Sequence, residues 1–451
     1  MKILYGAIIS SLVTSSTLFG VTIDQNSKNN SLVVYSNIGL VHEQRELNLA
    51  ENDNKIIYEG VASSINIDSV NINLPTNVSL FSQQYRYDKL TKQKLLNAHI
   101  GKTIDVRVKD NAQNFQTIEA ILLSNDGTSS IVKTKDNLII SVENKNIIFK
   151  TIPDELITKP SLVWNVKTDS EIQADMSIDY LINRIKWRSN YILNLTKEKA
   201  ELSGWITIDN NSGKAFKDTN LYLLAGDINR VREHRVQREM VKMLRVADSS
   251  PNISQQAHEG YHFYTVPFKV TLANNEKTQL KFISQKNLDI KREYSSRMNN
   301  PNYFRGEIQH NVTQYITLKG LEYPLPKGVV RTYSKLGKTN ILLGESSIQH
   351  TPKNTTIKLK LGKNFDVKVK ETMLNYDDGT WNLDVDIKYS IKNSSDKEKN
   401  VEILVPFNKN SGSKVSSDEN YRFTKGNLVT FNITVKPQST KEFKAHFKTK
   451  K

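Results

Sequence analysis

The sequence contains no cysteine in its 451 residues. This absence excludes disulfides, thiol catalysis, zinc–thiolate sites and iron–sulfur clusters together. It also excludes the lipid-modified cysteine of a lipoprotein. A chain without disulfides must be held by its hydrophobic cores, and at roughly 150 residues per domain this one is long enough for about three domains.

Motifs for catalysis and for cofactor binding are also lacking. The eight histidines form no HExxH or HxxEH spacing, and there is no GxSxG elbow, Walker loop, dinucleotide GxGxxG or EF-hand loop. We therefore predict no cofactor and no metal site. A Ser–His–Asp arrangement assembled by the fold alone has no sequence signature, so an enzyme stays an alternative. Asp384 and Asp386 lie opposite an apolar face, which is more typical of a solvated strand than of a glycosidase pair.

Only one long uncharged run is present, and it lies at the N-terminus. Residues 3–19, ILYGAIISSLVTSSTLF, follow Lys2, and the small residue Gly20 precedes a polar stretch. This layout predicts a secretory signal peptide over residues 1–20. The alternative is an uncleaved anchor, which the Ser and Thr content disfavours. No later run reaches 18 apolar residues, so we expect no transmembrane segment after signal cleavage and an exported protein in the periplasm or on the outer surface of a bacterium.

The net charge is +16, from 63 Lys and Arg against 47 Asp and Glu. An excess of this size indicates either an anionic partner or a lysine-rich solvated surface, and the second is the more common case. Nucleic acid is not expected as the partner of an exported protein. An anionic polymer, an unknown envelope protein or the surface of a membrane fits better.

Alternation of apolar and polar residues dominates the chain and predicts β-strands. In residues 185–195, Trp187 shares its parity with Tyr191 and Leu193. In residues 381–391, Trp381 shares its parity with a regular apolar row. Both tryptophans are therefore expected to pack in cores rather than to form exposed platforms for carbohydrate.

Strands separated by turn signals favour sandwiches or barrels, so the predicted fold class is mainly β and multi-domain. It comprises β-sandwiches, a small β-barrel-like insert and one helix near 229–247. Prolines between the predicted strands suggest the domain boundaries. The expected parts are a signal peptide (1–20), an N-terminal β-domain (21–93), a small β-barrel-like domain (94–150), a central β-domain with the basic helix (151–330) and a C-terminal immunoglobulin-like β-sandwich (331–451).

The expected helix at 229–247 carries a basic stripe. Arginine binds phosphate and carboxylate bidentately, so the stripe is a candidate surface for anions or lipid headgroups. The alternative is an ordinary solvated helix face. The anion-binding candidates are Arg230, Arg232, Arg235, Arg238, Lys242 and Arg245.

Four further residues are aromatic candidates for binding. Trp205 has the opposite parity to Leu202 and Ile206, and its environment is open. The segment YHFYTVPF supplies the other three, Tyr261, His262 and Tyr264.

Several stretches resemble a known family. They are residues 181–231 with the motifs SGWITIDNNSG and LLAGDINRV, residues 261–283, 324–333 and 343–367, and the N-terminal stretch 31–72. They are similar to bacterial proteins with the domain of unknown function 4139, whose relatives include the mucoidy inhibitor A type proteins. The resemblance implies an exported, β-rich protein and transfers no catalytic residue. The mucoidy inhibitor relatives usually carry a coiled coil where this chain has residues 94–150, which show no heptads.

These observations favour an exported cell-envelope protein that acts as a non-enzymatic scaffold or as a binding module for an envelope polymer or a protein partner. The competing hypothesis is an envelope hydrolase or transferase whose site is assembled by the fold. That hypothesis predicts a deep pocket that holds histidine and carboxylate groups.

Overall fold

The computed structural model describes residues 20–451 except 25, 110–113, 226–253, 259–260 and 409–411. Strands make up 66% of the described residues. The described residues form thirty β-strands, one α-helix and two short 3₁₀ helices, Ile67–Ser69 and Asn144–Asn146. The predicted mainly β, multi-sheet fold is confirmed. Among the described residues, no helix is long and apolar enough to cross a membrane.

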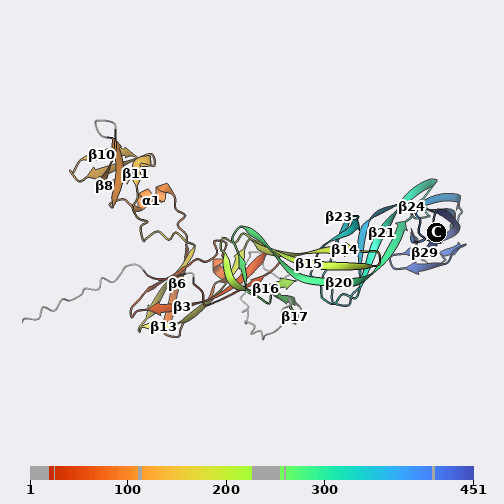
Figure 1. Ribbon diagram of the computed structural model, residues 1–451, viewed down its shortest axis with the longest axis horizontal. Helices are drawn as coiled ribbons and strands as arrows, with labels where there is room; N and C mark the ends of the chain where they lie inside the picture. Colours follow the sequence, from red (N-terminus) through yellow and green to blue (C-terminus); the bar gives the residue numbers. More distant parts are fainter. Residues whose placement is uncertain (1–19, 25, 110–113, 226–253, 259–260, 409–411) are drawn as a thin grey trace, which may run out of the picture. The chain divides into compact units, whose positions relative to one another are not determined.

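The chain divides into two compact units (Figure 1). The first unit holds the described residues up to Lys186 together with Asp209–Leu224 and Thr265–Glu276. The second holds Trp187–Ile208, Lys277–Lys451 and the described part of Ala225–Tyr264. The units interleave along the chain, whereas the sequence suggested consecutive domains. The expected helix at 229–247 lies outside the described residues.

Two sheets form the body of the first unit. One sheet has the order β1-β4-β12-β6, and the other runs β16-β2-β3-β13-β5 with β19 paired to β16. The strands of the first sheet are β1 (Val21–Ile23), β4 (Lys55–Glu59), β12 (Ser161–Thr168) and β6 (Val78–Arg86). Those of the second are β16 (Phe216–Ala225), β2 (Asn29–Val34), β3 (Ile38–Leu49), β13 (Ile172–Asn183), β5 (Asn71–Asn73) and β19 (Val270–Leu272).

The predicted boundary near residue 150 does not separate two cores. β12 pairs with both β4 and β6, so residues beyond 150 complete the sheet that the N-terminal segment begins. A β-sheet joins strands by backbone hydrogen bonds regardless of their distance in sequence, and proline punctuation carries no information on that pairing.

The segment at 94–150 forms a small sheet of its own. The order is β10-β9-β8-β7-β11, and among the described pairings β10 and β11 do not join, so the sheet is open. The strands are β7 (Thr103–Lys109), β8 (Phe115–Asn125), β9 (Ser129–Thr134), β10 (Ile139–Glu143) and β11 (Ile147–Ile148). Helix α1 (Lys92–Ala98) precedes them, with Thr91 as its N-cap, and places Leu96 in their core.

The second unit contains a long sheet of order β23-β22-β14-β15-β20-β21-β24-β25-β30-β27, with β26, β28 and β29 beside it. Its strands are β14 (Ile185–Leu195), β15 (Lys199–Asn210), β20 (Glu276–Arg297), β21 (Glu307–Lys319), β22 (Gly328–Leu336), β23 (Thr339–Ile348), β24 (Ile357–Asp378), β25 (Asn382–Asn393), β26 (Lys399–Pro406), β27 (Lys414–Ser417), β28 (Tyr421–Thr424), β29 (Leu428–Val435) and β30 (Ser439–Lys450). β17 (Ser254–His258) and β18 (Tyr261–Thr265) are neighbouring strands.

Two hydrophobic cores lie along this long sheet. One gathers Tyr191 and Leu193 with Leu359, and the other gathers Val367 with β25, β26, β29 and β30. The 22-residue strand β24 contributes to both cores, and β20 and β21 do the same. The predicted boundary at 330/331 falls inside β22, which pairs in parallel with β14. The C-terminal sandwich therefore has its core from about Val367 onward, with Tyr294, Met298 and Val312 added from β20, the turn after it and β21.

Candidate functional site

The structure places only some of the predicted site residues. The anion-binding candidates Arg230, Arg232, Arg235, Arg238, Lys242 and Arg245 lie outside the described residues, as do the side chains of Tyr261 and His262. Tyr264 is buried and packs edge-on against Trp187, with ring centroids 6.1 Å apart. Burial raises the pKa of the Tyr264 hydroxyl above its ordinary value. Tyr264 is thus a core residue, while Trp205 is half-buried on β15, opposite in parity to the buried Leu202 and Ile206.

Trp381 corrects the sequence interpretation. It is 78% exposed, although the residues that share its parity, from Leu383 to Ile391, are buried. β25 begins at Asn382, so Trp381 belongs to the turn after β24 and not to the strand. Alternation fixes which face a residue takes only within a strand, and it does not extend to a turn.

Trp381 lies at one end of the C-terminal sandwich together with a second exposed aromatic residue. Tyr303, in the turn between β20 and β21, is 83% exposed. Its neighbour Asn302 accepts a hydrogen bond from the Thr449 hydroxyl at 3.0 Å. The backbone N–H of Lys451, two residues after Thr449, donates to the carbonyl of Trp381 at 3.1 Å. These contacts attach both turns to the last residues of β30.

A third ring completes what we call the aromatic end, defined as Tyr303, Tyr376 and Trp381. The guanidinium carbon of Arg305 lies 3.0 Å from the ring centroid of Tyr376, a cation–π contact. This contact holds the turn that carries Tyr303 against β24, and within the turn Arg305 also donates to the carbonyl of Phe304 at 2.7 Å. Trp381 and Tyr303 are exposed, whereas Tyr376 is partly buried against the sandwich core, so the first two rings are the ones suited to contact a partner.

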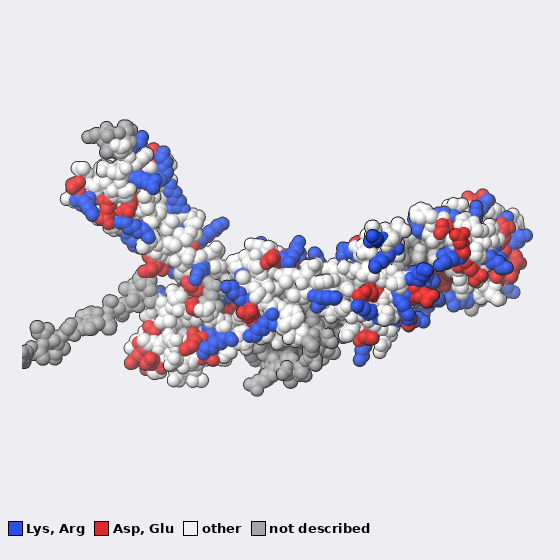
Figure 2. Space-filling model, viewed as in Figure 1, with Lys and Arg blue, Asp and Glu red and all other residues white. Residues whose placement is uncertain are grey.

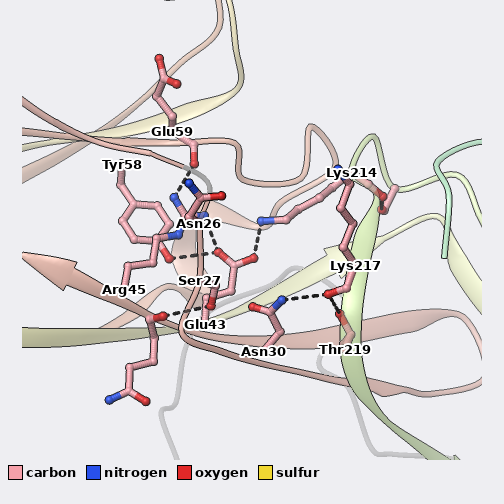
Figure 3. A network of polar contacts seen from close by, with 12 residues as sticks. Asn26, Ser27, Asn30, Glu43, Arg45, Tyr58, Glu59, Lys214, Lys217 and Thr219 are labelled. Carbon is pink, nitrogen blue, oxygen red and sulfur yellow. Dashed lines mark hydrogen bonds and ion pairs between the residues drawn. The ribbon is translucent and has the colours of Figure 1, made fainter. Parts of the chain in front are cut away.

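The first unit contains a buried ionic network between its two sheets (Figure 3). Glu43 and Arg45 come from β3, Tyr58 comes from β4, and Lys214 lies in the turn before β16. One Glu43 oxygen accepts from the Arg45 guanidinium at 2.6 Å and from the Tyr58 hydroxyl at 3.0 Å, and the other accepts from Lys214. Arg45 is fully buried and stacks 3.7 Å from the ring centroid of Tyr58.

In this network one carboxylate, Glu43, lies between two cations, Arg45 and Lys214. Burial disfavours ionised Glu43, but the Lys214 and Arg45 cations outweigh that effect and lower the pKa of Glu43 to about 2. Burial lowers the pKa of Lys214 and Glu43 opposes that change. Burial, followed by the charge of Glu43, raises the pKa of Tyr58 well above its ordinary value. Arg45 further donates to the carbonyls of Asp24 and Glu59 at 2.6 and 2.7 Å, so the network joins the sheets rather than facing a substrate.

The second unit buries a carboxylate whose three contacts all reach one oxygen, among them the backbone N–H of Asn299 at 3.2 Å. One oxygen of Glu371, on β24, accepts from the Asn299 amide group at 3.0 Å and lies 2.7 Å from His310 Nε2. The other oxygen has no hydrogen-bond partner among the described residues, and neither has the hydroxyl of Tyr389. Tyr389 is the register partner of Glu371 on β25. Burial and the nearby Glu371 charge raise the pKa of Tyr389.

The paired carboxylates noted in the sequence occur on the open face of the sandwich. His446 Nδ1 lies 2.8 Å from Asp386 and its Nε2 lies 3.1 Å from Asp384. Lys448 donates to Asp384 at 3.2 Å. Within the described part of the chain, no group of three or more His, Cys, Asp or Glu has the arrangement of a metal site. The cross-strand contacts make a ladder of surface ion pairs.

Surface depressions on the described residues include one beside β1 and one on the small sheet. A hollow of about 480 Å³ is lined by Val21–Asp24, Asn26–Lys28, Glu46 and Asn48, and one of about 250 Å³ lies on the small sheet beside Ile121 and Lys133. Neither lining includes a histidine. On the face shown in Figure 2, Lys and Arg are interspersed with Asp and Glu over the described parts, as on a solvated surface.

No family model matches this chain, and no curated protein matches it. The resemblance to proteins with the domain of unknown function 4139 stays a prediction from the motifs.

Proposed function

We propose that this chain is an exported protein of the bacterial cell envelope that acts as a non-enzymatic scaffold or as a binding module. The N-terminal apolar run supports export. The observation that carries the binding role is the aromatic end, where Trp381 and Tyr303 are 78% and 83% exposed on a rigid β framework. Exposed apolar surface marks an interaction site when it is contiguous, and the contacts at Thr449 and Lys451 bring these two rings to the same end of the sandwich.

The chemistry of the aromatic end favours an envelope polymer over a small substrate. Aromatic faces stack on the apolar faces of sugar rings, and the amide of Asn302 and the backbone at Lys451 lie beside them. The buried charged groups, by contrast, form their hydrogen bonds with other groups of the protein. Glu43 is occupied by three donors, and Glu371 is fully buried behind His310 and Asn299. An exposed platform binds an extended ligand without an enclosed pocket.

The test is co-sedimentation of residues 21–451 with isolated cell-wall polymer at low and high salt. Trp381→Ala combined with Tyr303→Ala should weaken binding roughly tenfold or more, and binding by the parent should persist at high salt because stacking is not screened. Phe365→Ala removes an aromatic side chain that is 85% exposed outside the aromatic end and serves as the matched control. Equal losses of polymer binding in the double variant and in the control, or no loss in either, would reject the aromatic end as the binding site.

Export is tested on the same protein made in a bacterium from the complete sequence. Mass spectrometry of the periplasmic or released fraction should find a mature N-terminus at Val21. A chain retained in the cytoplasm with residues 1–20 intact would contradict the envelope assignment.

A further inference from the structure

The β22–β23 hairpin carries large apolar side chains beyond the sheet that holds it. The strands are joined by the two-residue turn Gly337-Lys338, where Gly337 has a φ of 62°. Leu336, at the turn, is 68% exposed, and Leu342 and Ile341 are 52% and 39% exposed. Three aliphatic side chains are therefore in water on one short hairpin.

Both faces of this tip are open to solvent. Ile341 and Leu342 are consecutive and pair regularly with Ser334 and Tyr333, so they point to opposite faces of the hairpin. Ile341 is 39% and Leu342 52% exposed, so each face of the hairpin is at least partly open here.

The root of the hairpin is fixed. Val330 and Ile348 are buried in the core that contains Tyr191. Gly344 approaches β24 so closely that a Cβ there would lie 2.2 Å from the carbonyl oxygen of Leu361. The Ser346 hydroxyl donates to the carbonyl of Lys360 at 2.7 Å. The tip is therefore carried by a root that is packed into the core.

Uncompensated positive charge surrounds the tip. Lys335 and Lys338 are exposed on either side of Leu336 and Gly337. Neither lysine takes part in any ion pair found among the described residues. The acidic residue of the hairpin, Glu345, is paired with Arg331 at 2.7 Å. The tip thus combines two free cations with three exposed aliphatic side chains.

We propose that this tip docks the protein on an anionic lipid membrane, with Leu336 and Leu342 in the acyl boundary and Lys335 and Lys338 at the headgroup phosphates. Two features favour lipid over a protein partner. A fluid interface surrounds a projection on both faces, whereas a protein groove covers one. Free lysines beside apolar side chains are complementary to anionic headgroups. The inference rests on the proposed envelope function and names one partner for it.

The experiment uses residues 21–451, so that the apolar run of residues 3–19 cannot itself insert. Sedimentation is measured at low salt with vesicles of phosphatidylglycerol and phosphatidylcholine, and with phosphatidylcholine alone. We expect binding to the anionic vesicles. Leu336→Ser combined with Leu342→Ser should weaken it more than tenfold, because the apolar contact is lost. Lys335→Glu combined with Lys338→Glu should weaken it at least as much, since each basic residue near such a surface contributes roughly fivefold.

Two matched controls accompany these variants. Leu374→Ser replaces a leucine that is 48% exposed on β24, and Lys425→Glu replaces an exposed lysine at the turn between β28 and β29. Both should bind vesicles as the parent does, and circular dichroism confirms that every variant folds. These controls separate the tip from general hydrophobicity and general charge.

Three outcomes would overturn the proposal. The first is parental binding that the tip variants leave unchanged. The second is no binding of the parent to anionic vesicles, and binding to cell-wall polymer in that case would leave the proposed function standing. The third is a dimer of the parent in solution that the leucine variants dissociate while vesicle binding persists, which would assign the tip to a second copy of the chain.

Discussion

Glu43 and Glu371 are both excluded from water, one in each unit, yet their surroundings differ. Glu43 is neutralised by two cations and also accepts from a tyrosine hydroxyl. Glu371 has His310 and Asn299 on one oxygen and leaves its other oxygen and the nearby Tyr389 hydroxyl without partners. A buried carboxylate is costly unless its charge and its lone pairs are satisfied. The comparison indicates that the Glu43 carboxylate is satisfied on both oxygens where it joins two sheets, although Arg45 Nε beside it has no partner among the described residues, whereas Glu371 leaves one of its own oxygens unpaired.

The largest effect should follow from removing Arg45. Arg45→Met leaves Glu43 with one cation and uncovers the carbonyls of Asp24 and Glu59, so the first unit should lose about 3–5 kcal/mol of unfolding free energy. Urea unfolding, with hydrogen exchange of β3, measures the loss. Arg86→Met, which breaks an exposed pair with Asp88, is the control and should cost less than about 1 kcal/mol. Equal costs for the two variants would show that the network is not structural.

The pH dependence of the first unit should be nearly as large. The folded pKa of Glu43, about 2, lies below its ordinary 4.5, so its contribution is complete above pH 4.5 and is lost as the pH falls towards 2. The loss over this window is about 3 kcal/mol. The midpoint of urea unfolding of the parent should therefore fall as the pH is lowered from 5.5 to 2.5. Glu43→Gln should lower stability at pH 5.5 and flatten the dependence, whereas Glu51→Gln, at an exposed turn, should keep the parental slope. An unchanged slope in Glu43→Gln would contradict the assignment.

The smallest effect should come from a matched pair of hydroxyl deletions. Tyr58→Phe removes a donor to the Glu43 carboxylate and should cost about 1.5–3 kcal/mol. Tyr389→Phe removes a buried hydroxyl without a partner among the described residues. The unfolding free energy of this variant should therefore be unchanged or rise by up to about 1 kcal/mol. Both rings are fully buried, so packing changes are comparable. Thermal or urea unfolding measures the stability of each variant. A larger loss of stability in Tyr389→Phe than in Tyr58→Phe would contradict the comparison between the two carboxylates.

The strand faces could be predicted from local alternation. β14 spans Ile185–Leu195 and buries Tyr191 and Leu193, as its pattern indicated, and β25 buries alternate residues from Leu383 to Ile391. The failure at Trp381 came from extending that pattern one residue past the strand.

The candidate site was harder to predict. Glu43 and Arg45 share the parity of the buried Val41 and Leu47 on β3, so parity alone could have placed them inside. Their partner could not have been found in this way, because Lys214 is 171 residues away in sequence. The exposed turn at Tyr303 has no pattern of its own, and its position beside Trp381 depends on the last residues of β30.

The sequence by itself determined that the cores hold without disulfides, that strands predominate, and which face of each strand is apolar. These are properties of composition and of a backbone repeat of two residues, and both are local. The tertiary structure decided which strands pair, as β12 does with β4 and β6, and which charged residues enter the interior. Strand pairing and the burial of charges depend on partners that are far away in the sequence. A local pattern does not identify which distant strand or counter-charge that partner will be.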